Sequence, residues 1–224
     1  MKSKNKKTLV IGAGGQIGKI LIEQLENKGS SVVALVRSKS KAQKFIDSGI
    51  ETVVADLEGD FEHAFKGCDR VVFSAGSGGA TGYDKTLLID LWAAKKAVDY
   101  ALNNNIQHFV MVSGLGVANP DEFVTEIKPY LVAKYFADNY LMESGLVYTI
   151  LRPGSLINDN GTGLIRTSRP VKFSDLIIPR EDVASVINYS LSNDEMKGKI
   201  VELFSGAESI ETAFKEETIE VNNL

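Results

Sequence analysis

The sequence predicts an α/β fold in which a mostly parallel central sheet carries helices on both faces. Short apolar, β-branched runs alternate with helical patterns along the whole chain, and this alternation is typical of parallel strands joined by helical crossovers. Most strand-like runs are continuously apolar, which indicates strands buried on both faces. The runs lie at residues 8–11, 31–36, 52–54, 70–74, 108–112, 147–152 and 200–204.

Helical patterns separate these runs, with apolar side chains at the spacing of one helix face. The patterns cover residues 16–28, 84–104, 129–144 and 181–192. Crossovers between parallel strands are expected to be right-handed, and the sheet is expected to be doubly wound. We expect a single domain over residues 1–224, in which the less periodic segment 155–180 forms a small C-terminal cap.

Composition and charge narrow the classes of function. With 224 residues, of which 44% are hydrophobic, the chain is long enough for one domain with a full core. The net charge of −4 argues against a general affinity for nucleic acid or for a membrane surface. The one cysteine, Cys68, excludes an internal disulfide, and two distant histidines make a metal site unexpected. No apolar stretch has transmembrane length, so we expect a cytoplasmic protein.

Glycines at the spacing GxxGxxG follow the first expected strand, at positions 12, 15 and 18. One glycine permits the tight turn, another lets the backbone approach a pyrophosphate, and the last lets the helix pack close to the sheet. The free N–H groups at the helix start then face the phosphates. This context indicates a Rossmann fold that binds a dinucleotide, and the alternative is a tight turn without a ligand. The expected contacts are Gly12, Gly14, Gly15, Gln16 and Ile17.

The end of the second expected strand distinguishes two forms of such a cofactor. An acidic residue there favours NAD, whereas an arginine accommodates the 2′-phosphate of NADP. Arg37 stands at this place, and its planar, permanently charged fork suits a phosphate. Ser38 could donate a further hydrogen bond. We therefore expect NADP (NADPH) to be preferred over NAD, while the lysines at 39, 41 and 44 could be a solvated basic face.

Two further strand ends are expected to line the cofactor. Asp56 and Leu57 follow the third strand, where Asp56 could accept a hydrogen bond from the adenine amino group or simply cap the next turn. The fourth strand leads into Ala75, Gly76 and Ser77. Such small residues let a ligand lie close to the backbone, and the alternative is a flexible loop.

A tyrosine and a lysine four residues apart open the helix expected at 129–144. Tyr130 and Lys134 share one helical face, and Ser113 ends the preceding strand. A nearby ammonium lowers the pKa of a phenol, so Tyr130 could exchange a proton with a carbonyl or alcohol that Ser113 also holds. Lys134 could hydrogen-bond the nicotinamide ribose. The alternative is an exposed helical pair with a packed ring.

The chain resembles an atypical short-chain dehydrogenase/reductase of the NAD-dependent epimerase/dehydratase-like kind. Besides the glycine turn and Ser113, the resemblance rests on segments 129–134, 148–154 and 179–184. It implies Tyr130 as acid/base, with Lys134 lowering its pKa and anchoring the ribose. It also implies that Ser113 orients the substrate. The segment that would line the nicotinamide comprises Pro153, Gly154, Ser155 and Leu156.

One position departs from the family pattern: where the family has a catalytic asparagine on its central helix, Asp90 occupies the comparable stretch. The leading interpretation is an NADP-dependent oxidoreductase, or an epimerase/dehydratase-like enzyme, acting on a small carbonyl or alcohol. The alternative is a non-catalytic NADP-binding redox sensor or regulatory protein. Substrate contacts are expected from residues 77–83, 114–127 and 155–175, and the oligomeric state stays open.

Overall fold

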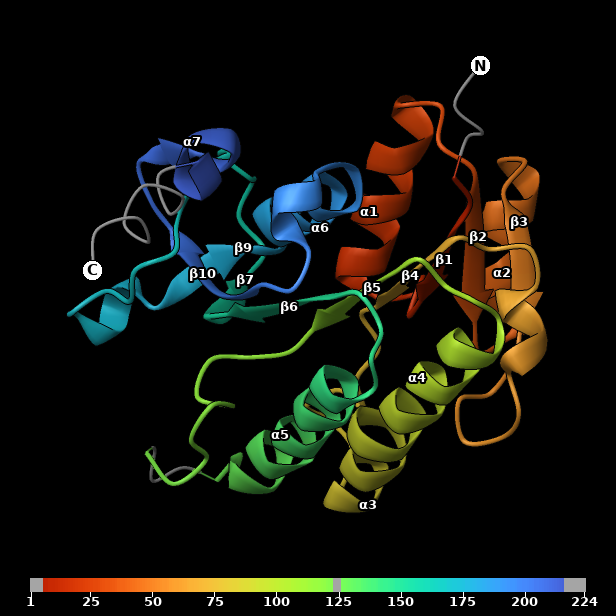
Figure 1. Ribbon diagram of the computed structural model, residues 1–224, viewed down its shortest axis with the longest axis horizontal. Coiled ribbons are helices and arrows are strands. Elements are labelled where there is room, and N and C mark those ends of the chain that lie inside the picture. Colours follow the sequence, from red (N-terminus) through yellow and green to blue (C-terminus); the bar gives the residue numbers. More distant parts are fainter. Residues whose placement is uncertain (1–5, 123–125, 216–224) are drawn as a thin grey trace.

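Parallel strands form the centre of the fold in the computed structural model, which describes residues 6–122 and 126–215 (Figure 1). Their order across the sheet is β3-β2-β1-β4-β5-β6-β10, the order of a doubly wound Rossmann sheet. The predicted α/β fold with a largely parallel sheet and flanking helices is confirmed. The strands are β1 (Thr8–Ile11), β2 (Val32–Val36), β3 (Glu51–Val54), β4 (Arg70–Phe73), β5 (His108–Val112), β6 (Tyr148–Pro153) and β10 (Ile200–Ser205).

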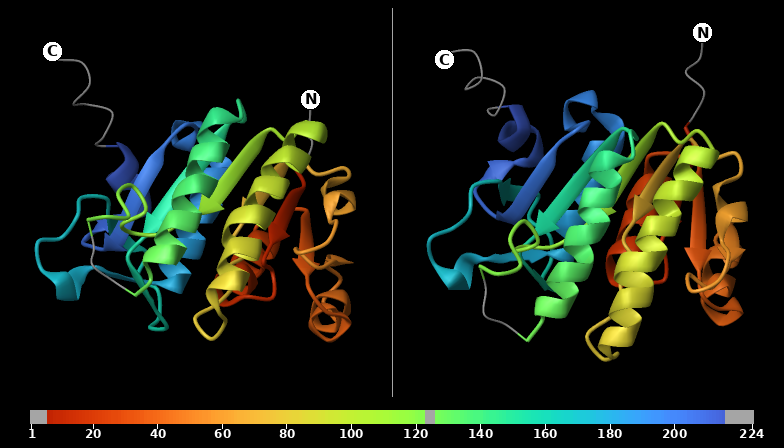
Figure 2. Two further views of the ribbon diagram at one scale, coloured as in Figure 1. Left: turned by 90° about the horizontal axis from the view of Figure 1, so that it is seen from below. Right: turned by 60° about the horizontal axis from the view of Figure 1, so that its bottom comes forward.

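Helices cover both faces of this sheet because successive strand residues point to opposite sides. In β1, Val10 packs into one core cluster, whereas Leu9 and Ile11 pack into the other. Figures 1 and 2 show the two helical layers. The Val10 side is covered by α1 (Gln16–Asn27), α2 (Lys39–Asp47) and α6 (Arg180–Ser192). The opposite side is covered by η1 (Glu62–Phe65), α4 (Ala94–Asn103) and α5 (Lys128–Glu143).

The helix α2 was not predicted from the sequence. Its residues are mostly charged or polar and exposed, and its buried side chains are Ala42 and Phe45. Two apolar residues three apart make a weak periodic signal. This short helix nevertheless positions a lysine at the functional cleft, as described below.

The predicted helix over 84–104 contains a change of helix type. It begins as α3 (Tyr83–Lys85), continues as the π-helical segment η2 (Thr86–Ala93) and ends as α4. Asp90, in η2, is buried. A π-helical segment within an α-helix is rare and is frequently found at functional sites.

Segment 155–180 contains short strands. β7 (Ser155–Ile157) and β9 (Ile177–Pro179) form a parallel pair, with η3 (Phe173–Asp175) just before β9. β8 (Leu164–Arg166) runs antiparallel to β10 and to β11 (Glu208–Ser209). The remaining elements are η4 (Asp194–Met196) and α7 (Ile210–Lys215). In the part of the chain described, no helix combines the length and the apolar character needed to cross a bilayer.

A buried histidine in β5 makes the stability of the fold depend on pH. The Nε2 atom of His108 lies 2.9 Å from the Thr149 hydroxyl oxygen, and that hydroxyl donates to the Met196 carbonyl at 2.6 Å. Burial, assisted by Lys197 and Arg70, lowers the pKa of His108 to about 4. Unfolding exposes His108 to water and restores its ordinary pKa. Below that pKa, the unfolded chain binds a proton at His108, whereas the folded protein does not until the pH approaches 4.

We therefore expect the free energy of unfolding to decrease by about 3 kcal/mol, on account of His108, as the pH falls from about 6.5 to about 4. Urea unfolding of the wild type and of His108→Gln across this range measures the difference. The variant should lose less stability toward acid pH than the wild type. His63→Gln, at an exposed histidine, is the control and should follow the wild type. Equal acid sensitivity of His108→Gln and wild type would contradict the assignment.

Candidate functional site

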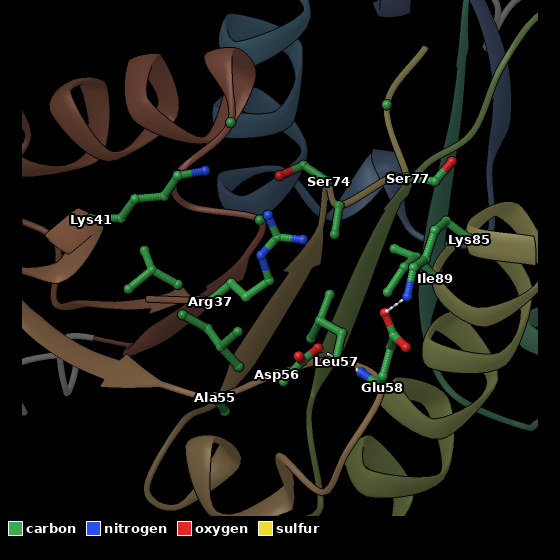
Figure 3. A pocket seen from close by; sticks show the side chains of 18 of the residues that line it. Arg37, Lys41, Ala55, Asp56, Leu57, Glu58, Ser74, Ser77, Lys85 and Ile89 are labelled. Atoms are coloured by element: carbon green, nitrogen blue, oxygen red, sulfur yellow. Dashed lines mark hydrogen bonds and ion pairs between the residues drawn. The ribbon is translucent and has the colours of Figure 1, made fainter. Parts of the chain in front are cut away.

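A cleft of about 460 Å³ lies where the carboxyl ends of β1, β2, β3 and β4 meet (Figure 3). Its walls come from the glycine turn, the ends of these strands and the start of the π-helical stretch. This is the edge at which doubly wound sheets bind their ligands. We call it the cofactor cleft because residues predicted to contact the cofactor line it, namely Gly12, Gly14, Gly15, Arg37, Asp56, Leu57, Ala75, Gly76 and Ser77.

The glycine turn has no room for side chains at two of its positions. Gly12 has φ +92°, and a Cβ there would lie 2.7 Å from the backbone nitrogen of Ala75. A Cβ on Gly18 would lie 2.4 Å from the Gly12 carbonyl oxygen. Larger residues at either position would push the turn away from its neighbours.

The start of α1 is suited to an anion. Its N-cap residue is Gly15, no side chain caps the helix, and its first turn carries no acidic residue. The N–H groups of this turn and the positive end of the helix dipole therefore remain available to a diphosphate. The side chains of Gln16 and Ile17 do not line the cleft, and Ile17 is buried in the core. Only their backbone N–H groups could serve as predicted.

Two cations stand at the β2 end of the cleft. Arg37 follows β2 and Lys41 comes from α2, and both side chains are directed into the cleft (Figure 3). Within the described residues, Arg37 has no ion-pair partner. For Lys41 the alternative of a solvated basic face does not apply, because Lys41 lines the cleft. Ser38 does not line it, because its hydroxyl lies 3.0 Å from that of Ser40 instead.

The wall opposite these cations is acidic. Asp56 lines the cleft, and its carboxylate accepts the N–H of Glu58 at 3.0 Å, so the turn-capping alternative is realised. Glu58 forms an ion pair of 2.6 Å with Lys85 of α3 (Figure 3). This pair joins the loop after β3 to the helix that follows the loop after β4.

Asp90 forms a hydrogen bond with the backbone of the loop that follows β4. Its Oδ2 atom accepts the N–H of Ser77 at 3.0 Å, and a Cβ on Gly76 would lie 3.0 Å from its Oδ1 atom. The π-helical segment thus presents a buried carboxylate to the backbone that lines the cofactor cleft. Asp90 here acts on the protein backbone at the place where the resembled family carries its catalytic asparagine.

A second pocket, of about 490 Å³, opens at the ends of β5 and β6. Ser113 and Tyr130 line it together, and so do the four residues predicted to line the nicotinamide, Pro153, Gly154, Ser155 and Leu156. A Cβ on Gly114 would lie 3.6 Å from the Tyr130 hydroxyl, so this hydroxyl lies over the end of β5. The second pocket and the cofactor cleft therefore lie along the same edge of the sheet. Residues 123–125, within the expected substrate segment 114–127, lie outside the described part.

Lys134 lies beneath this pocket and does not line it. Its side chain is fully buried, and its ammonium donates to the Val112 carbonyl at 2.7 Å. The expectation that Lys134 lowers the pKa of Tyr130 is wrong for this structure. Burial raises the pKa of Tyr130 well above its ordinary value, and the carboxylates of Asp90 and Asp138 raise it further. Without a bound ligand, Tyr130 is a phenol and not a phenolate at neutral pH.

A buried ionic network supports the pocket from below. Asp138 is fully buried and accepts hydrogen bonds from Ser113 Oγ at 2.9 Å and from Arg152 Nε at 3.1 Å. Burial raises the pKa of Asp138, while Lys134 and Arg152 oppose this shift. Because the Ser113 proton points to Asp138, Ser113 can accept a hydrogen bond from Tyr130 or from an alcohol. It cannot at the same time donate that proton to a substrate carbonyl, so Ser113 could hold a substrate oxygen only as an acceptor.

Sequence reasoning missed Asp138, Arg152 and Lys41. A signal for Asp138 was present, since Tyr130, Lys134 and Asp138 follow one another at intervals of four and share one helical face. Arg152 comes from another strand, so only the sheet register could have placed it. No sequence signal distinguished Lys41 from its neighbouring lysines.

The glycine turn, the cations at the end of β2 and the sheet order together define a dinucleotide-binding protein with a Rossmann fold. The sequence profile of a family described as NAD(P)H-binding matches residues 12–194. The chain belongs to this family, which confirms the resemblance inferred from its motifs.

Relatives with similar sequences span nearly the whole chain. A Bacillus subtilis protein named "uncharacterized sugar epimerase YhfK" is 42% identical, over 93% of this chain and 99% of its own. Sanguinarine reductase of Eschscholzia californica is 28% identical, over 96% and 94% respectively. A solved structure from Bacillus halodurans, titled a putative NAD-dependent epimerase/dehydratase, has 41% identity and a TM-score of 0.89, covering 94% of this chain and 99% of its own.

Proposed function

We propose that the protein is an NADPH-dependent reductase of carbonyl compounds in which Tyr130 donates the proton. The observation that carries this proposal is the position of the Tyr130 hydroxyl. It lies over Gly114 at the end of β5, in a pocket shared with Ser113 and beside the cofactor cleft. A proton donor at this place can reach the oxygen of a substrate bound next to the nicotinamide.

The residues of the cleft fit a dinucleotide. The side-chain-free turn at Gly12 and the uncapped start of α1 would hold the diphosphate, and Arg37 with Lys41 would hold the 2′-phosphate. The segment 153–156 would face the nicotinamide. When bound, the reduced cofactor supplies the hydride that adds to the carbonyl carbon.

The protonation state of Tyr130 is the one that carbonyl reduction needs. Reduction requires a protonated Tyr130, which gives its proton to the carbonyl oxygen as the alcohol forms. A tyrosine carries this proton at neutral pH, and the raised pKa of Tyr130 extends the protonated form to more alkaline pH. The name of the Eschscholzia relative, a reductase, agrees with this direction.

Turnover separates this proposal from a non-catalytic NADP sensor. The purified chain is mixed with NADPH and a panel of aldehydes and ketones, and loss of NADPH absorbance is followed. Cofactor-dependent conversion of a carbonyl to its alcohol is expected. If NADPH binds tightly but no member of the panel is reduced, the sensor becomes the better interpretation.

The cofactor preference is tested at Arg37. Replacing Arg37 by Ala should weaken NADPH binding about 10- to 100-fold, because a charge-assisted contact to the 2′-phosphate is lost. NADH lacks this phosphate, so its affinity should change less than about twofold by the same reasoning. Fluorescence titration of both cofactors measures the change. Lys39→Ala, at an exposed residue outside the cleft, is the matched control. Equal wild-type affinities for NADPH and NADH would refute the preference.

A further inference from the structure

The second pocket is lined mainly by apolar side chains. Leu131 and Leu176 are buried at its base, whereas Ile127 and Phe173 are 53% and 80% exposed. Large apolar residues that stay exposed around a pocket mark a surface that a ligand covers. The apolar side chains used in this argument are Leu115, Ile127, Leu131, Leu156, Phe173 and Leu176.

The charge of this pocket is unlike that of the cofactor cleft. Among its described lining residues the one charged side chain is Glu122. Glu122 pairs with Arg169 at 2.8 Å, and Arg169 also pairs with Glu202, so one cation faces two carboxylates. Lys172, next to Phe173, does not line the pocket. A negatively charged substrate would therefore enter an apolar pocket without a cation to receive it, at a cost in desolvation.

We propose that the second pocket takes an apolar carbonyl compound that carries no negative charge, and excludes carboxylates and nucleoside-diphosphate sugars. This substrate class rests on the proposed reductase function, because it assigns the substrate of the same site. A nucleoside-diphosphate sugar combines hydroxyl groups with two negative charges, and the described lining residues offer neither a cation nor a dense set of polar partners. The name of the Bacillus subtilis relative, a sugar epimerase, therefore does not describe the chemistry of this pocket.

The test compares two probes that differ by one charge. Methyl benzoylformate is neutral, and benzoylformate carries a carboxylate on the same aromatic ketone. Binding of each is measured by calorimetry to the whole protein saturated with NADP⁺, a state in which no ketone is reduced. The oxidised nicotinamide ring is positive and favours the acid, so a preference for the ester comes from the protein. We expect the ester to bind at least about tenfold more tightly than the acid, and UDP-glucose not to compete with it.

Two variants locate the origin of the preference. Glu122→Gln should narrow the difference between ester and acid severalfold, because it removes one of two carboxylates that face Arg169. Phe173→Ala should weaken binding of the ester about tenfold through loss of an aromatic contact. Val171→Ala, two residues before Phe173, fully exposed and not lining the pocket, is the control and should bind like the wild type.

Binding of the acid or of UDP-glucose as tight as that of the ester overturns this substrate class, and so does failure of the ester to bind. None of these results affects the reductase proposal, which is judged by carbonyl turnover and by Tyr130. Conversely, if no carbonyl is reduced but the ester still binds more tightly than the acid, the pocket remains a binding site for apolar ligands.

Discussion

Replacing Tyr130 by Phe is expected to lower kcat for carbonyl reduction by about 10²- to 10⁴-fold, the usual contribution of a positioned proton donor. The ring would still fill its place beside Gly114, so the loss comes from the hydroxyl alone. The affinity for NADPH should change little, because the side chain lies in the second pocket and not in the cofactor cleft. Steady-state rates with the best carbonyl from the panel and a separate cofactor titration measure the two quantities.

Tyr135→Phe is the matched control on the same helix, because Tyr135 does not line either pocket described above. The pH dependence adds a second check. Since burial raises the pKa of Tyr130, kcat/KM for reduction should not fall between about pH 7 and about pH 10, where an ordinary phenol begins to ionise. Unchanged turnover in Tyr130→Phe would refute the proton-donor role, and would favour a substrate stacked over the nicotinamide that needs no tyrosine.

The second large effect is expected at Asp138, where Asp138→Asn should lower the unfolding free energy by about 3–5 kcal/mol. The amide keeps the shape of the carboxylate but not its charge. Arg152, whose side chain is 12% exposed, would then lose its ion-pair partner, and the fully buried Lys134 would lose one of the carboxylates that favour its charged form. Urea unfolding at pH 7 measures the loss.

Asp121→Asn is the control for this substitution, because Asp121 forms an ion pair with Lys128 and its side chain is 81% exposed. Such surface pairs contribute less than about 1 kcal/mol. The double variant Asp138→Asn/Arg152→Gln removes both charges and should recover part of the lost stability. A loss below about 1 kcal/mol in Asp138→Asn would show that the network carries little of the stability of the fold.

The sequence predicted the sheet and most helices because both depend on local apolar patterns. The strands at 8–11 and 108–112 have the predicted bounds, since each contains a continuous apolar run that stops at a glycine or a serine. The helix α2 was missed because only Ala42 and Phe45 are buried in it. The short strands β7 and β9 were missed as well, because their pairing joins residues about twenty positions apart and leaves no local pattern.

In the candidate site, too, features set by local sequence could be predicted and features set by tertiary contacts could not. Contacts made by backbone geometry, such as those of the glycine turn, follow from residue type and position. The pKa of Tyr130 does not, because it depends on loss of solvent and on Asp90, forty residues earlier in the chain. The pair between Asp138 and Arg152 depends on the register that sets Val112 beside Leu151, and with it Ser113 beside Arg152. Sequence spacing alone does not contain such distances.

Because of the π-helical segment η2, the number of residues between β4 and β5 matters for the site. A π turn takes up one more residue than an α turn, so it rotates every later side chain by about 100° relative to an uninterrupted helix. This offset allows Asp90 to reach the Ser77 backbone while Ala94, Ala97 and Ala101 still face the sheet. Deletion of a single residue from this segment would force a choice between the two. The helix could then either keep the packing of its alanines against the core or keep the hydrogen bond from Asp90 to the loop after β4. The extra residue of the π turn allows both.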